Sequence, residues 1–318
     1  MILKEDIRNA ALGLGFSTCG FADANYDPTR HGRLVDWLGR NLNAEMKYME
    51  RNHRQRFDPR VHLPNAKSVI VCSMNYYSEP HYDPSKAYIS LYARGEDYHK
   101  VIQDKLDSLG QIIHDRIKNV TLKSFVDSAP FAEKSWAAKA GLGYIGKNDL
   151  MIVFSKTDNN KRKSLGSFHF LGVLITDHEL EPDSRLNMTC GKCRKCVEAC
   201  PTGAILEDRF IDANKCNAYY TLSHKGPIVP DMAKHIGNNV YGCDLCQLAC
   251  PHNKNLASTS EPRFAPDPGM VDINIGQLAN LNEDEFENRF GKRSIGEKGF
   301  DIFKRNIEIV GRNLDISK

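Results

Sequence analysis

Hydrophobic residues form two kinds of pattern over residues 1–180 of the chain, a helical period and short apolar runs. The helical period of about 3.6 residues is clearest over residues 98–118, where apolar residues return every three or four positions. Short apolar runs bounded by turn-forming residues alternate with such segments and predict strands. We expect helices over residues 3–14, 32–52, 98–118 and 131–140, and strands over residues 13–21, 68–74, 122–126, 150–154 and 168–176. This alternation is typical of an α/β body.

The rest of the chain has a different organisation. Cysteines dominate residues 181–255, and residues 256–318 contain two short helical patterns, over residues 283–290 and about 300–314. We therefore expect three parts, namely an α/β body over residues 1–180, a cysteine-rich module over residues 181–255 and a short helical segment over residues 256–318.

Composition places the chain among ordinary globular proteins. Its 318 residues are 41% hydrophobic and 26% charged, and a chain of this length can bury a core without disulfides. No apolar run approaches the roughly 20 residues that span a bilayer. Acidic residues at Glu5 and Asp6 stand where a signal peptide needs an apolar stretch. We expect a cytoplasmic protein and no membrane partner.

The net charge of +3 is too small to indicate a nucleic-acid-binding protein by itself. Basic residues are nevertheless concentrated in two segments, one over residues 156–163 and one over residues 289–312. Most short basic runs are only solvated faces, so these two segments await a chemical reason for an anionic partner.

The cysteines supply the clearest chemical signal. Eight of the ten lie between residues 190 and 250, and such clustering in a cytosolic setting argues against a disulfide framework. The run Cys190-x2-Cys193-x2-Cys196-x3-Cys200-Pro is the spacing of bacterial ferredoxins with two [4Fe–4S] clusters. In that spacing three thiolates hold one cluster and the fourth reaches the other.

A second, shorter run completes the set of thiolates. Its pattern is Cys243-x2-Cys246-x3-Cys250-Pro, and Cys216 lies between the two runs. We expect one cluster on Cys190, Cys193, Cys196 and Cys250, and the other on Cys200, Cys216, Cys243 and Cys246. Zinc is the alternative, but zinc ribbons use paired C-x2-C knuckles instead of this repeat. Cys19 and Cys72 are expected to be small buried hydrophobic residues.

A glycine-rich stretch, GLGYIG at residues 141–146, imitates two nucleotide-binding motifs. It matches G-x-G-x-x-G and, with Lys147, nearly matches the P-loop. Both motifs need a strand, then a turn, then a helix, whereas the order expected here is helix, turn, strand. The open alternatives are a close approach of backbone to another group and a simple helix end with a tight turn.

Asp127 is the best catalytic candidate in the body. It follows the expected strand 122–126, at the end where open α/β sheets place ligands, although Asp also serves well as a helix N-cap. Asp97 and His99 begin the D-x-H-x-x-G pattern that supplies a histidine to cobalamin, but Ile102 replaces its glycine. Asp97 is therefore expected to cap a helix.

These segments together resemble the epoxyqueuosine reductase family. The resemblance rests on YARGEDYH at 92–99, DSAP at 127–130, WAAKAGLGYIGKN at 136–148 and the two cysteine runs. It implies a cobalamin-binding α/β body related to that of reductive dehalogenases, joined to a ferredoxin-like module with two [4Fe–4S] clusters. It also implies reduction of epoxyqueuosine to queuosine at the wobble position of tRNA by cob(I)alamin, bound base-off, with electrons relayed by the clusters.

The resemblance also assigns roles to residues. Asp127 is expected to be the proton donor and to lie against the cofactor. Contacts to the corrin amides or to the cofactor phosphate are expected from Arg56, Arg94, His99, Lys147, Asn148 and Ser167, with Asp244 and Leu245 near the corrin edge. The tRNA backbone is expected to contact Lys161, Arg162, Lys163, Lys292, Arg293, Lys304 and Arg305.

The chain departs from the family pattern in three places. Many members carry a longer C-terminus of HEAT-like repeats, so we expect residues 256–318 to be a shortened RNA-binding segment. Lys134 replaces an expected Arg, and residues 158–164 resemble a small insertion. We expect a monomer served by an external one-electron donor of the flavodoxin or ferredoxin type. The alternatives are a cobalamin-dependent reductive dehalogenase, which normally carries an export signal, and a plain electron-transfer ferredoxin.

Overall fold

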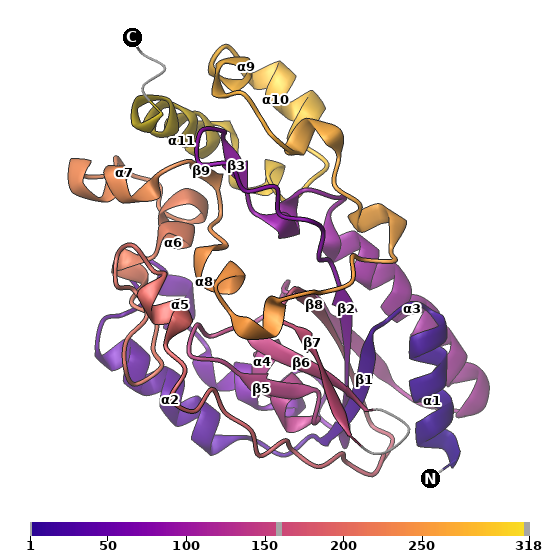
Figure 1. The fold of residues 1–318 in the computed structure, drawn as a ribbon. Coiled ribbons are helices and arrows are strands. Elements are labelled where there is room, and N and C mark those ends of the chain that lie inside the picture. The colour runs from indigo at the N-terminus through magenta and orange to yellow at the C-terminus, as the bar shows by residue number, and fades with distance from the viewer. Residues whose placement is uncertain (1, 157–160, 315–318) are drawn as a thin grey trace.

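A four-stranded sheet forms the centre of the body (Figure 1), in a computed structural model that describes residues 2–156 and 161–314. Its order is β1-β2-β8-β4, with β1 at Thr18–Asp23, β2 at Ser68–Asn75, β8 at His169–Thr176 and β4 at Leu122–Phe125. Every neighbouring pair is antiparallel, whereas alternating helices and strands usually accompany parallel pairing. Long connections between these strands let the chain reverse direction.

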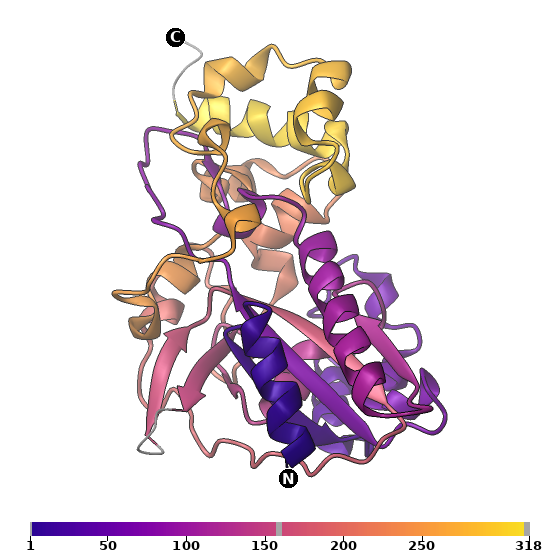
Figure 2. The same ribbon diagram turned by 90° about the vertical axis from the view of Figure 1, so that its right-hand side faces the viewer.

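Helices cover both faces of this sheet because its strand residues alternate between the two sides. Ile70 and Cys72 pack with α1 (Ile2–Gly13) and α3 (Tyr98–Arg116), which lie side by side in Figure 2. Val69 and Val71 point the other way and pack with α4 (Glu133–Lys139). Cys19 and Cys72 are both buried in the hydrophobic core between the sheet and helices α1 and α3, as the sequence predicts.

A second sheet follows α4 and contains the glycine-rich stretch. It comprises β5 (Gly143–Ile145), β6 (Met151–Lys156) and β7 (Arg162–Gly166), all antiparallel. Gly141 has a φ of +74° and links α4 to β5, so the order is helix, turn, strand and neither nucleotide-binding motif is formed. A Cβ on Gly143 would lie 1.8 Å from the Ile152 carbonyl oxygen, so the close approach is to a neighbouring strand.

A further hydrophobic core, distinct from the two on either face of the central sheet, contains residues of all three expected parts. Strand β3 (Tyr88–Ile89) pairs in parallel with β9 (Asn239–Tyr241), and apolar residues of both pack against the C-terminal helices. Those helices are α9 (Ile275–Ala279), α10 (Glu283–Phe290) and α11 (Phe300–Asn313), seen together at the top of Figure 1. The module itself contains α5 (Lys195–Glu198), α6 (Asn217–Leu222), α7 (Pro230–Ile236) and α8 (Leu245–Leu248).

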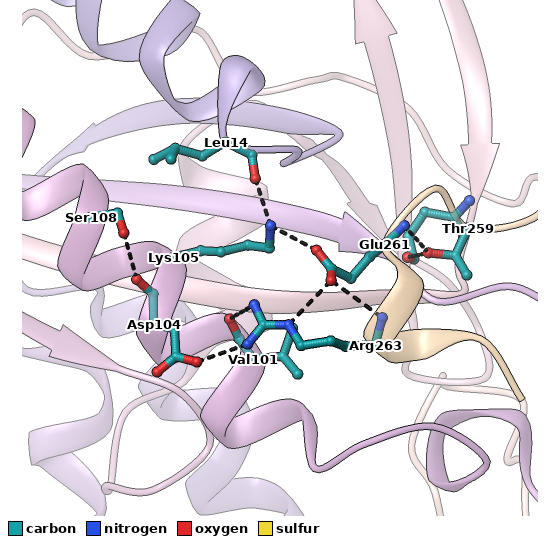
Figure 3. Close-up of polar contacts among 9 residues, drawn as sticks. Leu14, Val101, Asp104, Lys105, Ser108, Thr259, Glu261 and Arg263 are labelled. Carbon is teal, nitrogen blue, oxygen red and sulfur yellow. Dashed lines mark hydrogen bonds and ion pairs between the residues drawn. The ribbon is translucent and has the colours of Figure 1, made fainter. Parts of the chain in front are cut away.

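The chain that leaves the module is tied back to α3 by a network of charges (Figure 3). Lys105 Nζ lies 2.7 Å from a Glu261 oxygen and donates to the Leu14 carbonyl at 2.8 Å. Arg263 bridges Glu261 at 3.2 Å and Asp104 at 2.8 Å. Burial alone raises the pKa of Glu261, but Lys105 and Arg263 outweigh it and hold that pKa below its usual value. The network fixes the C-terminal segment relative to the body.

The helix expected over residues 32–52 is wrong in its extent. Helix α2 begins at Pro28 and ends at Gly39. The chain then passes through Asn41 and Ala44, both with positive φ, which cannot continue a right-handed helix. Short 3-10 turns follow at Lys47–Met49, His53–Phe57 and Pro59–Val61. Within the described ranges, none of the helices combines the length and apolar character that a membrane span requires.

Candidate active site

A cavity of about 960 Å³ opens where the body, the module and the C-terminal segment meet. The body supplies residues of α2, the turn at His53–Phe57 and the loop before α4. The module supplies residues 209–211 and 222–223, and the C-terminal segment supplies residues 294, 297 and 298. The cavity therefore depends on the assembled fold, and three of the predicted residues line it, namely Asp127, Arg56 and His99.

Asp127 is held in the cavity wall by two neighbours. Its backbone has a φ of +50°, an uncommon conformation for a residue other than glycine. Its N–H donates to Glu133 Oε1 at 3.1 Å, and its Oδ2 accepts from the Tyr98 hydroxyl at 2.6 Å. The N-cap of α4 is Ala132, so the alternative that Asp127 caps this helix is wrong. The carboxylate is exposed and available to a ligand.

Tyr98 reaches Asp127 from the first turn of α3. Asp97 caps this helix, as predicted, by accepting from the His99 N–H at 2.9 Å. The Tyr98 ring stacks on Phe170, with ring centroids 4.3 Å apart and an interplanar angle of 3°. Burial, together with the charge of Asp127, raises the pKa of the Tyr98 phenol well above its usual value. Tyr98 therefore stays protonated and donates its hydrogen bond throughout the physiological range.

Two further ionisable groups stand beside Asp127. Burial, with a smaller contribution from the Asp127 charge, raises the pKa of Glu133 to about 7. Burial lowers the pKa of Arg56, and its buried Nε has no hydrogen-bond partner within the described residues. His99 is hydrogen-bonded to Asp97 at 2.8 Å, and this contact raises the pKa of the imidazole. The wall thus holds an acid that titrates near neutrality and an unpaired guanidinium N–H.

The neighbours of several clustered cysteines agree with the two groups expected from the sequence, and their roles as cluster ligands stay a prediction. Burial raises the pKa of Cys250, and Cys190 and Cys193 are close enough to raise it further. Cys196 likewise has Cys190 and Cys250 as charged neighbours after the larger effect of burial. The fold therefore brings Cys250 near Cys190, although the two lie at opposite ends of a stretch of 61 positions.

The second group is assembled in the same way. Burial raises the pKa of Cys243 to about 12, and Cys216 and Cys200 are among its charged neighbours. Cys246 is affected first by burial and then by Cys243, Cys216 and Cys200. Buried thiols resist deprotonation, but coordinated iron reverses this preference. Four soft sulfur donors in each group suit a [4Fe–4S] cluster.

Six residues expected to contact the corrin do not line the large cavity. Arg94 is 2% exposed and donates to the carbonyls of Ile89 and Pro80, each at 2.9 Å. Lys147 donates to the Cys193 carbonyl at 2.8 Å, and Asn148 donates to the Cys246 carbonyl at 3.4 Å. These last two side chains connect the glycine-rich loop to both cysteine groups.

The other three of these residues lie at or near the second cysteine run. The buried Asp244 carboxylate accepts from the Tyr88 hydroxyl at 3.0 Å and from the Leu91 N–H at 2.8 Å. Ser167 Oγ accepts from the Asn253 side-chain amide at 2.9 Å. Leu245 is the first residue of α8. Their predicted contact with the corrin stays a prediction.

The predicted tRNA-contacting residues fall into two kinds. Lys161, Lys163, Lys292 and Lys304 are exposed, and Arg162 donates to the Gly141 carbonyl at 3.5 Å. Arg293 instead pairs with Asp267 at 2.6 Å, and Arg305 donates to the carbonyls of His224 and Gly226. These two guanidinium groups hold the C-terminal segment in place, so the lysines are the better candidates for RNA contact.

Sequence reasoning missed Tyr98 and Glu133. The hydrogen bond from Tyr98 to Asp127 joins residues 29 positions apart, so no local pattern reveals it. Glu133 lies six positions after Asp127, and the available signal was an acidic residue that follows Phe131 and Ala132 at the start of an expected helix. It also missed the arginines on α2 and at residue 209, because they are scattered along the sequence.

Known proteins resemble this chain over nearly its full length. The family described as Epoxyqueuosine reductase QueG, DUF1730 matches residues 56–128, and a 4Fe-4S double cluster binding domain matches residues 189–253. An epoxyqueuosine reductase of Cellulophaga algicola is 38% identical, with 96% of each chain covered. That of Escherichia coli is 34% identical and is covered over 80% of its length by 97% of this chain.

Solved structures give the same relationship. A crystal structure of epoxyqueuosine reductase with a tRNA-Tyr epoxyqueuosine-modified stem loop has a TM-score of 0.88 and 28% identity, with 98% of this chain and 82% of that chain covered. The epoxyqueuosine reductase of Streptococcus thermophilus has a TM-score of 0.86 and 30% identity, with 99% and 82% covered. The match at residues 189–253 favours iron–sulfur clusters over zinc.

Proposed function

The chain belongs to the epoxyqueuosine reductase family, and from this membership we propose that it reduces epoxyqueuosine to queuosine at the wobble position of tRNA. The observation that carries the proposal is the position of Asp127. Its carboxylate is exposed at a cavity whose wall also includes the module that holds the two cysteine groups. Such a site joins an electron supply to a proton donor.

The reaction needs two electrons and two protons. The two C–O bonds of the epoxide break, an alkene forms and the oxygen leaves as water. Cobalamin, held against the cavity wall, would supply reducing electrons for this chemistry, and [4Fe–4S] clusters held by the eight cysteines would supply one-electron equivalents. Asp127 delivers a proton to the departing oxygen, as general acids do when they lie within hydrogen-bond reach.

Tyr98 and Glu133 act as positioning residues for Asp127. The Tyr98 hydroxyl fixes one carboxylate oxygen of Asp127, a residue that lines the cavity. Glu133 accepts the Asp127 N–H and so maintains the left-handed backbone that aims this side chain. A strained residue held by surrounding bonds is common where geometry matters for chemistry.

The cavity wall suits the cofactors that the family implies. A corrin is a flat, largely apolar ring with an amide-bearing rim, and its carbonyl oxygens match the buried Nε of Arg56 that lacks a partner within the described residues. Arg56 and His99 would hold the rim, and the cysteines would hold the clusters in the two groups given above. A tRNA substrate also implies a cytoplasmic location and a one-electron donor of the flavodoxin or ferredoxin type.

Anaerobic turnover tests the proposal. Protein reconstituted with iron, sulfide and cobalamin is mixed with an artificial reductant and tRNA that contains epoxyqueuosine, and the nucleosides are then analysed by mass spectrometry. We expect loss of one oxygen from the modified nucleoside. Fully loaded protein that leaves epoxyqueuosine unchanged would contradict the proposal, and Asp127→Asn, loaded to the same level, serves as the matched control.

A further inference from the structure

A second cavity of about 240 Å³ lies beside the large one and shares part of its wall. Arg30, Arg33 and Arg209 line both cavities, and Arg185 lines the smaller one. These arginines come from α2, from the segment that leads to Cys190 and from the loop after α5. The fold therefore brings four guanidinium groups from three distant segments to one small space.

Acidic groups neutralise only part of this charge. Asp149 also lines the smaller cavity, but its carboxylate is paired with Lys134. Arg185 pairs with Asp27 at 2.8 Å. Arg33 donates to backbone carbonyls at residues 208 and 209 and packs over the Phe210 ring. These contacts position two of the arginines and leave the cavity positively charged.

Arg30 and Arg209 have no such contacts. Neither guanidinium has a hydrogen-bond or ion-pair partner among the residues that the structure describes. Burial, with repulsion from Arg185 and Arg33, lowers the pKa of Arg30 despite the opposing charges of Asp27 and Asp149. Arg30 is half-buried whereas Arg209 is exposed. A half-buried cationic group without a partner costs folding free energy that a bound anion would offset.

We propose that the smaller cavity binds a phosphodiester through Arg30 and Arg209. The planar guanidinium fork matches phosphate oxygens and binds them with two parallel hydrogen bonds. The wall shared with the large cavity implies that the anion belongs to a larger ligand extending between the two spaces.

This inference rests on the proposed function, which supplies two sources of a phosphodiester. One is the tRNA backbone beside the modified nucleotide. The other is the nucleotide tail of base-off cobalamin, which carries one phosphodiester, and the experiment distinguishes the two.

The test compares an Arg30→Gln/Arg209→Gln variant with wild-type protein, both loaded with clusters. A double variant Arg116→Gln/Lys118→Gln removes two exposed charges at the far end of α3, away from both cavities, and serves as control. Fluorescence anisotropy measures the affinity for an anticodon stem-loop RNA over a range of salt concentrations. Equilibrium dialysis measures the affinities for cobalamin and for cobinamide, which lacks the phosphate and the nucleotide.

If RNA is the source, the RNA affinity of the arginine variant falls about tenfold or more and its salt dependence flattens by about one ion, while cobalamin binding is unchanged. If cobalamin is the source, cobalamin affinity falls about tenfold or more while cobinamide affinity is unchanged.

Wild-type affinity for both ligands would overturn the inference, as would an equal loss with cobinamide or an equal loss of RNA affinity in the control variant. Failure of the proposed function would appear separately, as absent turnover by the loaded wild-type protein.

Discussion

Replacing Glu133 with glutamine is expected to make the protein more stable and less active. Glu133 begins α4 and accepts the Asp127 N–H at 3.1 Å. Glutamine keeps the size of the side chain and a carbonyl oxygen for this hydrogen bond, but it removes the ionisable group. The substitution therefore separates the role of the charge from the role of the hydrogen bond.

The structure gives the size and the direction of the stability change. Burial raises the pKa of Glu133 from its usual value of 4.5 to about 7, with a smaller effect of the Asp127 charge. The folded state thus binds this proton more tightly than the unfolded state does. Linkage then requires that Glu133 lowers the free energy of unfolding as pH rises from about 4.5 to about 7, with no further change above.

At pH 8 the ionised Glu133 lowers the free energy of unfolding by about 3 kcal/mol, since each pKa unit corresponds to 1.36 kcal/mol. At pH 5.5 the same argument leaves only about 1 kcal/mol. The difference in free energy of unfolding between Glu133→Gln and wild type should therefore increase, in favour of the variant, by about 2 kcal/mol from pH 5.5 to pH 8. Because charge at this position also acts on Asp127, we expect the turnover rate to fall while the affinity for RNA stays the same.

Urea denaturation of cluster-loaded protein under anaerobic conditions measures the difference between wild type and variant at several pH values. Glu133→Ala is the comparison variant, because it loses the acceptor for Asp127 as well and should not keep the stability gain in full. A pH-independent difference between Glu133→Gln and wild type, or a variant less stable than wild type at pH 8, would refute the reasoning.

Three further predictions follow from the same structure. Asp127→Asn should keep both clusters and lose turnover by roughly 10²- to 10⁴-fold in single-turnover assays. Iron and sulfide analysis should give about eight of each per chain, unchanged in Cys19→Ser and Cys72→Ser, because both cysteines are buried in the apolar core. Glu261→Gln should destabilise the protein by about 1–2 kcal/mol at pH 7. Ion pairs hold the pKa of Glu261 low despite burial, so this difference should disappear as pH falls through that pKa in acid denaturation.

The sequence predicted best those features that local physics determines. The apolar period over residues 98–118 predicted α3, which spans Tyr98–Arg116, and α10 begins and ends at the expected residues. The spacing within each cysteine run is local, so the two groups could be proposed from the sequence, and the neighbours of Cys250 and Cys243 agree with that proposal. The helix expected over residues 32–52 failed because left-handed residues after Gly39 interrupt the pattern.

The sequence did not reveal which side chains would meet. The antiparallel order of the central sheet depends on how long connections return, and apolar periodicity carries no information about that. Arg293 and Arg305 lie in a basic run that suggests an open surface, yet each is bonded to carbonyl oxygens of distant segments. Neither feature can be read from a segment alone, since charge and period describe a segment and pairing describes the whole fold.

The two cavities collect the features that a stable fold usually avoids. Non-glycine residues with left-handed backbone are uncommon, yet Asn52, Asp127, Asp149 and Arg209 all have it and all line the larger cavity. The same wall holds Glu133, whose pKa burial raises, and the Arg56 Nε, which has no hydrogen-bond partner within the described residues. Left-handed backbone at such residues and burial of an ionisable or unpartnered polar group each cost folding free energy. Sequence patterns report what stabilises a segment, so they find the scaffold readily, whereas the active site becomes visible only where the folded structure retains unsatisfied groups.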